Sequence, residues 1–150
     1  MEQTGTDADC SGGQATYYAW YEMYPKFPVN LSMTVRPGDT MSASVTTDGR
    51  GSFTLTIRDI TRGTSFATTQ RLKHAKLASA EVIAEAPSGS GGVLPLTNFG
   101  TASFSAATVN GQPIGTFHPD RINMVLGTTT KAATSALSGG NAFSVTWKHS

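Results

Sequence analysis

The chain has 150 residues, a formal net charge of +1 and only 14% charged residues, and its length fits one domain with a single buried core. This charge balance provides no basic stripe of the kind that a phosphate backbone selects, and it gives no support to a strongly anionic substrate. We therefore predict one domain over residues 1–150 and no nucleic-acid partner.

The first predicted element is an aromatic strand that runs from Tyr17 to Pro25. Alternate side chains of a strand share a face. The residues on the more aromatic face are Tyr18, Trp20, Glu22 and Tyr24. One interpretation is ordinary packing on a sheet, where aromatic residues are common. The other is a groove that grips peptide side chains and raises the pKa of nearby carboxyls by desolvation.

The next two strands form a predicted hairpin. In Met41 to Thr47, apolar side chains alternate with Ser and Thr, as expected of a half-buried strand. A turn that contains Asp48-Gly49 follows, and Phe53, Leu55 and Ile57 then alternate with threonines. Two alternating runs joined by a short turn are typical of antiparallel neighbours.

A further strand is predicted over Ser79 to Ala86, where two carboxylates, Glu81 and Glu85, share a face with Ile83. At ~3.3 Å per residue the two carboxylates stand roughly 13 Å apart along the strand. That is too far to share a proton or to flank one scissile bond, so a catalytic partner must come from another strand. The alternative is a pair of solvated glutamates on an exposed sheet face.

The rest of the chain also favours strands. Residues 71–80 are the only helical candidate, and they lack a long apolar face. Alternation returns in Ala102 to Ala106 and in Phe143 to Trp147, and Ser88 to Gly92 is predicted to be a loop. The predicted turns are Pro37-Gly38-Asp39, Arg62-Gly63, Asn110-Gly111 and Gly139-Gly140. Many short strands at this spacing predict an all-β fold, an antiparallel two-sheet β-sandwich.

Other catalytic schemes find little support. His74, His118 and His149 are scattered without the spacing of metal ligands, so we expect no metal and no other cofactor. Cys10 is the only cysteine, and a small buried or loop thiol explains it better than a catalytic nucleophile. The sequence has neither a nucleophile elbow nor a phosphate-binding loop.

Composition also bears on the location of the protein. A low charge, 16 glycines and abundant Ser and Thr are typical of a secreted all-β protein whose surface titrates little in acid. No apolar run approaches the ~18 residues that span a bilayer, and the amino terminus has no export signal. We expect a secreted protein without a membrane partner, whose signal peptide is not present in this chain.

Four blocks of the sequence carry a family resemblance. They read YAWYEMYP at 18–25, VRPGDT at 35–40, SAEVIAEAP at 79–87 and LPLTNFG at 94–100. In this order, and over nearly the whole chain, they resemble the glutamic peptidases, also called eqolisins. The resemblance implies a concanavalin-like sandwich of two curved antiparallel sheets with a cleft on the concave face. It also implies an acid endopeptidase that acts on polypeptide substrates.

The resemblance extends to a catalytic dyad, a Gln with a Gly two residues later and a Glu near the end of the Ala/Glu strand. These are Gln3 and Glu85, with Glu81 as the fallback base. The residues to which the resemblance gives substrate-binding or supporting roles are Asp7, Trp20, Glu22 and Tyr24. An ionised Glu would take a proton from the attacking water, and a Gln amide would stabilise the oxyanion. Because the amide does not titrate, the dyad suits acid conditions.

Three features depart from the family. Val82 replaces the usual Trp of the strand motif, and Asp120-Arg121-Ile122 places a cation where a more neutral sequence is expected. Gln3 is the third residue, whereas the family has several strands before it, and a group so near a terminus should fray unless tied down. We therefore expect a chain that lacks some amino-terminal strands, monomeric if complete and open to edge-strand association if truncated.

The alternative function is a non-catalytic β-sandwich, either a truncated pseudo-enzyme or a module that binds carbohydrate or peptide. Concave sandwich faces with aromatic residues can bind ligands without any chemistry. In this interpretation, Trp20 and the neighbouring tyrosines form the binding platform.

Overall fold

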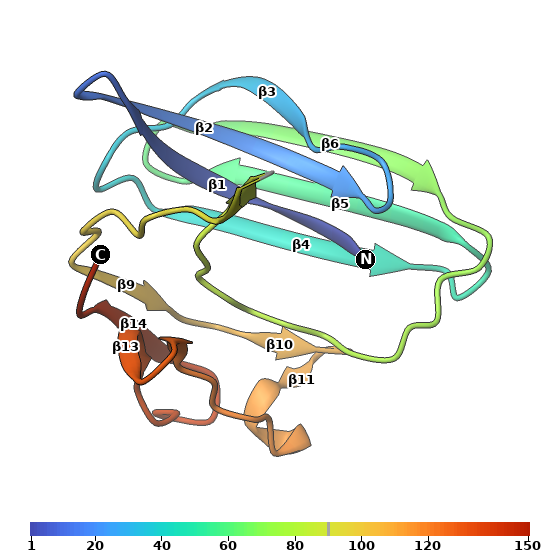
Figure 1. Ribbon diagram of the computed structural model, residues 1–150. Helices are drawn as coiled ribbons and strands as arrows, with labels where there is room; N and C mark the ends of the chain where they lie inside the picture. The colour runs from blue at the N-terminus through green and yellow to red at the C-terminus, as the bar shows by residue number, and fades with distance from the viewer. Residues whose placement is uncertain (90) are drawn as a thin grey trace. The chain divides into compact units, whose positions relative to one another are not determined.

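The structure is a computed structural model that describes residues 1–89 and 91–150, and within these residues it consists of β-strands and one short 3-10 helix (Figure 1). The chain divides into two compact units, Met1–Ala78 (unit 1) and Ser79–Ser150 (unit 2), and each is described by itself. Among the described residues, no helix has the length and apolar character needed to cross a membrane.

The first sheet of unit 1 is antiparallel and contains β1 (Glu2–Ser11), β2 (Gln14–Met23) and β3 (Val29–Thr34) in that order (Figure 1). The two residues between β1 and β2, Gly12-Gly13, both have positive φ, as a two-residue type I′ hairpin turn requires. This turn fixes the register, in which Ser11 pairs with Gln14. The predicted strand began only at Tyr17, so the prediction missed β1 and the turn.

The second sheet of unit 1 contains β4 (Met41–Thr47), β5 (Ser52–Asp59) and β6 (Thr64–Arg71). The predicted hairpin of β4 and β5 is confirmed, with Val45 opposite Leu55. The predicted half-burial of β4 is wrong for most of the strand. Val45 remains 40% exposed because β4 is an edge strand, whereas Leu55 in the central strand is 1% exposed.

The turn between β4 and β5 is held by the side chain of Asp48. Its Oδ1 accepts hydrogen bonds from the backbone N–H groups of Arg50 at 2.7 Å and Ser52 at 3.0 Å, and these bonds lower the pKa of Asp48. Gly51 in the same turn has a φ of 92°, and a Cβ there would lie 2.9 Å from the carbonyl oxygen of Leu72. Only glycine therefore fits this position without a shift of the backbone.

The two sheets of unit 1 pack face to face around an apolar cluster. Phe53 and Leu55 of β5 contact Met23 of β2, and all three side chains are buried. Tyr21 of β2 stacks on Phe66 of β6, with the ring centroids 5.8 Å apart. Since Tyr21 and Met23 face this core, the residues that alternate with them in β2 lie on the opposite face of the sheet.

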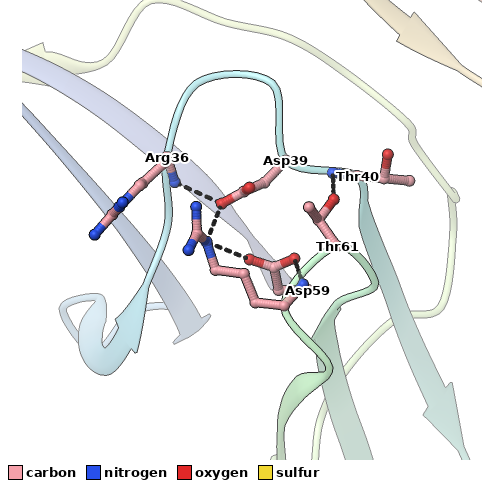
Figure 2. A network of polar contacts seen from close by, with 6 residues as sticks. Arg36, Asp39, Thr40, Asp59 and Thr61 are labelled. Atoms are coloured by element: carbon pink, nitrogen blue, oxygen red, sulfur yellow. Dashed lines mark hydrogen bonds and ion pairs between the residues drawn. The ribbon is translucent and has the colours of Figure 1, made fainter.

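A charged network, the Asp39–Arg62–Asp59 clamp, ties the loop after β3 to the turn after β5 (Figure 2). Asp39 Oδ2 accepts hydrogen bonds from the backbone N–H of Arg36 and from Arg62 Nε, both at 2.8 Å. Asp59 is 1% exposed and accepts a 2.9 Å bond from the backbone N–H of Arg62. The Arg62 guanidinium beside Asp39 lowers the pKa of Asp39 below its usual value of 3.8.

Unit 2 contains one larger antiparallel sheet. Its strands, in spatial order, are β12 (Met124–Leu126), β13 (Thr129–Thr134), β14 (Phe143–Trp147) and β9 (Thr101–Phe104). The smaller elements are β7 (Ser88–Gly89), β8 (Gly92–Val93), β10 (Thr108–Val109), β11 (Gln112–Pro113) and the 3-10 helix η1 (Ile114–Phe117). β7 pairs with β8 and β10 with β11, so both are short antiparallel hairpins.

The core of unit 2 is a cluster of Leu96, Ala132 and Val145, all buried. Phe104 and Phe143 are direct cross-strand partners, and their rings stack with centroids 4.8 Å apart. The predicted strand at 143–147 is confirmed as β14, and its alternate residues Phe143, Val145 and Trp147 belong to this cluster. The predicted strand at 102–106 is β9, displaced by one to two residues.

Four other predictions concern segments in both units. The segment 79–86 is not a strand, because no ladder partner is assigned to it among the described residues. Residues 71–80 form no helix, as expected. The predicted loop at 88–92 contains β7 and β8 instead, and residue 90 within it lies outside the described residues. Turns occur at all four predicted positions.

Candidate functional site

One face of the β1–β2 hairpin, which we call the site face, gathers most of the predicted site residues of unit 1. Direct cross-strand partners on this face are Gln3 with Glu22, Gly5 with Trp20, and Asp7 with Tyr18. Strand alternation places them opposite the face that packs on β5. The structure therefore places four predicted site residues, which stand 2 to 19 positions apart in the sequence, on one face: Gln3, Asp7, Trp20 and Glu22.

The side-chain amide of Gln3 is held by a carboxylate, since Gln3 Nε2 donates a hydrogen bond to Glu22 Oε2. A primary amide carries two N–H donors, so one donor remains for a ligand. The adjoining backbone is also tied down: Thr4 Oγ1 donates to the Trp20 carbonyl at 2.7 Å, and the Tyr24 N–H donates to the Met1 carbonyl at 2.9 Å. These bonds oppose the fraying expected of a residue so near the terminus.

The indole of Trp20 lies against the backbone of Gly5. A Cβ at Gly5 would stand 3.6 Å from Trp20 Cζ2, so the missing side chain leaves the strand surface open to the ring. In the register of the hairpin, this contact lies between the Gln3–Glu22 and Asp7–Tyr18 partners. The site face is therefore a row in which an apolar platform separates two polar pairs.

Two carboxylates meet the hydroxyl of Tyr18. Tyr18 Oη lies 3.1 Å from Asp7 Oδ2 and 2.9 Å from Asp9 Oδ2, and Asp7 Oδ1 accepts a 2.7 Å bond from the Ala8 N–H. Burial, and then the bonds to Asp9 and Asp7, raise the pKa of the Tyr18 phenol well above its usual range. The prediction did not include Asp9 or this use of Tyr18. Strand alternation could have found Asp9, which stands two residues after Asp7.

Tyr24 does not continue the site face as a strand residue. β2 ends at Met23, and the Tyr24 side chain is 59% exposed. The prediction that the strand extends through Pro25 is therefore wrong, because Tyr24 and Pro25 lie in a turn, although the Tyr24 N–H still donates to the Met1 carbonyl. A supporting role for Tyr24 stays a prediction.

Glu85 belongs to the segment 79–87 of unit 2. Its neighbours Ala84 and Ala86 pack against the cluster of Leu96, Ala132 and Val145, while Glu85 itself is exposed. Glu81 is exposed as well and accepts a 3.2 Å hydrogen bond from Ser79 Oγ. Gln3 lies in unit 1 and Glu85 in unit 2, so their partnership stays a prediction.

Other features of the described chain contribute little to a catalytic site. Residues 1–89 and 91–150 contain no group of three or more His, Cys, Asp or Glu arranged to hold a metal ion. A shallow groove between β3 and β6, lined in part by Leu31, Met33, Arg62 and Phe66, includes none of the predicted site residues.

Comparisons with known proteins identify the family and the fold of this chain. The sequence model of the peptidase A4 family matches residues 1–147. The chain is 36% identical over 64 residues to Aspergillopepsin-2 of Aspergillus niger, a match that covers 42% of this chain and 23% of that relative's length. The chain thus spans less than two thirds of the curated relative that it matches.

Two solved structures have the same fold. The crystal structure of aspergilloglutamic peptidase from Aspergillus niger matches with a TM-score of 0.85 at 26% identity, over 98% of this chain and 89% of that chain. Scytalido-glutamic peptidase, crystallised with a transition state analog inhibitor, matches with a TM-score of 0.70 at 19% identity, over 98% and 75%. The predicted antiparallel β-sandwich is confirmed. With a family match over nearly its whole length, this chain belongs to the peptidase A4 family, the glutamic peptidases that its sequence blocks resemble.

Proposed function

We propose that this chain is an acid endopeptidase that hydrolyses peptide bonds of polypeptides, with Gln3 as the oxyanion donor and Glu85 as the general base. Membership of the peptidase A4 family supports the reaction class. The observation that carries the proposal is the hydrogen bond from Gln3 to Glu22, which orients a neutral amide on a face that also carries Trp20.

The role of Gln3 follows from the donors of its amide. Glu22 accepts a hydrogen bond from one N–H, which fixes the plane of the amide, and the second N–H can donate to the oxygen of a peptide carbonyl. As water attacks that carbonyl, the oxygen becomes negative, and a fixed donor stabilises this charge without reorganisation. Loss of one such donor in other hydrolases costs about 3 to 4 kcal/mol of transition-state stabilisation.

The role of Glu85 follows from its type and its exposure. An ionised carboxylate can accept a proton from the attacking water and return it to the departing amine. Packing of Ala84 and Ala86 on the unit 2 cluster orients the side chain between them away from that cluster. Glu81 is the fallback base, although Ser79 Oγ already donates a hydrogen bond to it.

Acid operation and secretion belong to the same proposal. Glutamate side chains in model peptides have a pKa of about 4, so this residue type can act as a base in mild acid, and an amide keeps its N–H donors at any pH of interest. The low charge content of 14% limits the number of groups that an acid medium would protonate. We therefore propose that the protein acts outside the cell on polypeptides, as a monomer if complete and with edge-strand association if truncated.

The test compares cleavage of a denatured protein at about pH 3 to 4, with pepstatin present to suppress aspartic peptidases, for the wild type and two variants. Glu85→Gln should lower kcat by about 10²- to 10⁴-fold, as loss of a general base does. Gln3→Ala should lower kcat by about 10²- to 10³-fold, as loss of an oxyanion donor does.

Glu81→Gln is the matched control, because it removes the other glutamate of the same segment. If Glu81→Gln abolished cleavage and Glu85→Gln did not, the base would be Glu81. Equal activity of the wild type, Gln3→Ala and Glu85→Gln would rule out the dyad. A folded wild type that binds peptide without cleaving it would favour the non-catalytic sandwich.

A further inference from the structure

β4 is an edge strand with β5 as its one ladder partner among the described residues, and its bonds to β5 show which backbone groups point outward. The Ile60 N–H donates to the Thr40 carbonyl at 2.8 Å, and the Asp48 N–H donates to the Ser52 carbonyl at 3.2 Å. Both bonds continue the β4–β5 register, so the even-numbered residues of β4 exchange hydrogen bonds with β5. The outward N–H and C=O groups belong to the odd-numbered residues Met41, Ala43, Val45 and Thr47.

Two apolar side chains of these odd-numbered residues lie on the core side of the sheet without being covered. Ala43 stands opposite Ile57 and Val45 stands opposite Leu55, and direct cross-strand partners share a face. Ile57 and Leu55 are each 1% exposed, whereas Ala43 is exposed and Val45 is 40% exposed. The outer edge of β4 therefore offers both outward backbone groups and apolar side chains that would gain from burial.

The other edges of the two sheets in unit 1 carry features that oppose pairing with a further strand. β1 contains the carboxylates Glu2, Asp7 and Asp9, β3 has an irregular register against β2, and β6 ends in Arg71. Charges and bulges of this kind protect edge strands from association. β4 contains no charged residue and no proline, and its pairing with β5 is regular. β4 is therefore the edge best suited to accept a further strand.

The strand also fits a second copy of itself. In an antiparallel pair centred on Ser44, Ala43 lies opposite Val45 of the second copy, and Met41 lies opposite Thr47 of the second copy. This register aligns all seven residues of both strands and places odd-numbered residues opposite odd-numbered ones. The outward backbone groups of both copies then bond each other, and no charges are opposed. Such a self-complementary surface is what a two-fold dimer requires.

We propose that β4 is a dimerisation edge, at which two copies of this chain pair through Met41–Thr47 about a two-fold axis at Ser44. The sheet of β4, β5 and β6 in one copy then continues into the same sheet of the other copy. Dimerisation through β4 rests on the edge-strand association of the proposed function and identifies its strand and its partner. Because the contact is one short strand, the dimer is weak and depends on protein concentration.

Sedimentation velocity of the full chain tests the dimer in a Cys10→Ser background, because Cys10 is exposed and could form unrelated disulfides. Between about 1 µM and 1 mM, the range of weak complexes, the average mass should rise from that of one chain toward that of two. Ala43→Pro should abolish this rise, because the N–H that it removes points outward and the β4–β5 bonds remain. A monomer throughout this range, or a rise that persists in Ala43→Pro, would overturn the proposal.

Ala67→Pro is the matched control on the edge strand β6. The Leu72 N–H donates to the Gly51 carbonyl at 2.9 Å in the register of β5 and β6, so even-numbered residues of β6 bond to β5. The N–H of Ala67, which is exposed, therefore points outward, as that of Ala43 does. Ala67→Pro should keep the rise in mass, and loss of the rise in both proline variants would contradict an interface specific to β4.

A cysteine pair tests the register without a disruptive substitution. Ser44 would face Ser44 of the second copy in a non-hydrogen-bonded pair, with Cα atoms about 4.5 Å apart, within reach of a disulfide. Mild oxidation of Ser44→Cys, in the same Cys10→Ser background, should therefore link two chains. Ser42→Cys is the control, because Ser42 would lie opposite Thr46 of the second copy and roughly 13 Å along the strand from its own counterpart. Equal linking of both variants, or no linking of Ser44→Cys, would overturn this pairing.

These measurements need no cleavage of substrate, so they stand apart from the test of Gln3 and Glu85. A dimer that fails to cleave protein would remove the peptidase proposal and leave the β4 pairing. A chain that cleaves protein but stays monomeric would remove the pairing and leave the dyad. A monomeric chain in which an extended peptide slows amide exchange in β4 would assign this edge to peptide and overturn the dimer.

Discussion

The site face of unit 1 and the Glu85 segment of unit 2 are held by different forces. Ten consecutive pairs of the β1–β2 ladder fix the position of each side chain on the site face. Hydrogen bonds then hold Gln3 and Asp7. The segment 79–86 has no assigned ladder among the described residues, and Ala84 and Ala86 anchor it by apolar contacts. A backbone ladder fixes register, whereas contacts of two small side chains fix only which face of a segment is inward.

This difference fits the two proposed roles. A donor that must meet a developing oxyanion gains from a rigid backbone, because its contribution depends on a fixed geometry. A general base transfers a proton and keeps its function as long as it reaches the water. The geometry of the site face therefore depends on the core beneath it, and the position of the Glu85 segment depends on the contacts of Ala84 and Ala86.

The largest expected effect comes from the core under the site face. Leu55 is 1% exposed and contacts Met23, the neighbour of Glu22 in β2. Leu55→Ala should lower the free energy of unfolding by about 3 kcal/mol, from lost burial and the cavity left behind. Urea denaturation would measure it. Val45→Ala, directly opposite on the edge strand and 40% exposed, should cost less than about 1.5 kcal/mol, and an equal cost for both would contradict the edge assignment.

Amide hydrogen exchange would measure the difference in backbone protection between the site face and the Glu85 segment. Ladder amides of β1 and β2 should exchange at least about tenfold more slowly than the amides of residues 80–86, since every 1.4 kcal/mol of opening free energy is tenfold. The amides of the β4–β5 ladder serve as a reference for paired strands. Strong protection across 80–86 would instead reveal backbone hydrogen bonds that hold Glu85 as firmly as Gln3.

The smallest effect concerns the Asp39–Arg62–Asp59 clamp of unit 1. Arg62 lowers the pKa of Asp39 below 3.8, so the ionised form stabilises the folded state. This contribution is fully present above pH 3.8 and is lost as the pH falls through the lower pKa of the folded state. Asp39→Asn should therefore have a lower urea midpoint than the wild type above pH 3.8, and the two midpoints should converge as the pH falls through the lower pKa of the folded state. Asp120→Asn, an exposed control, should show no such convergence.

Much of the fold could be predicted from the alternation of apolar residues and from turn residues. The β4–β5 hairpin and β14 lie where alternating apolar residues predicted them, and turns occur at all four predicted positions. The β1–β2 hairpin was equally readable, because Gly12-Gly13 is a two-residue turn signal that fixes Gln3 opposite Glu22. The register of this hairpin is therefore set by local turn chemistry.

Other features depend on neighbours that no local pattern names. Alternation in 79–86 correctly separated Ala84 and Ala86 from Glu85, but it could not tell whether a partner strand was present. Likewise, β4 alternates as a half-buried strand should, yet its place at the sheet edge leaves Val45 exposed. Alternation of apolar and polar residues shows which side chains of a strand share a face. Only tertiary packing decides what covers that face.

The sequence by itself therefore determined the all-β class, the β4–β5 hairpin and, through its four family blocks, the membership of the glutamic peptidases. The tertiary structure alone decided that the Gln3 amide donates to Glu22, that one phenol meets both Asp7 and Asp9, and that the Glu85 segment rests on apolar contacts. The physical reason is the range of the forces: turn and strand preferences act between neighbours in sequence, whereas hydrogen-bond geometry and burial depend on atoms that only folding brings together.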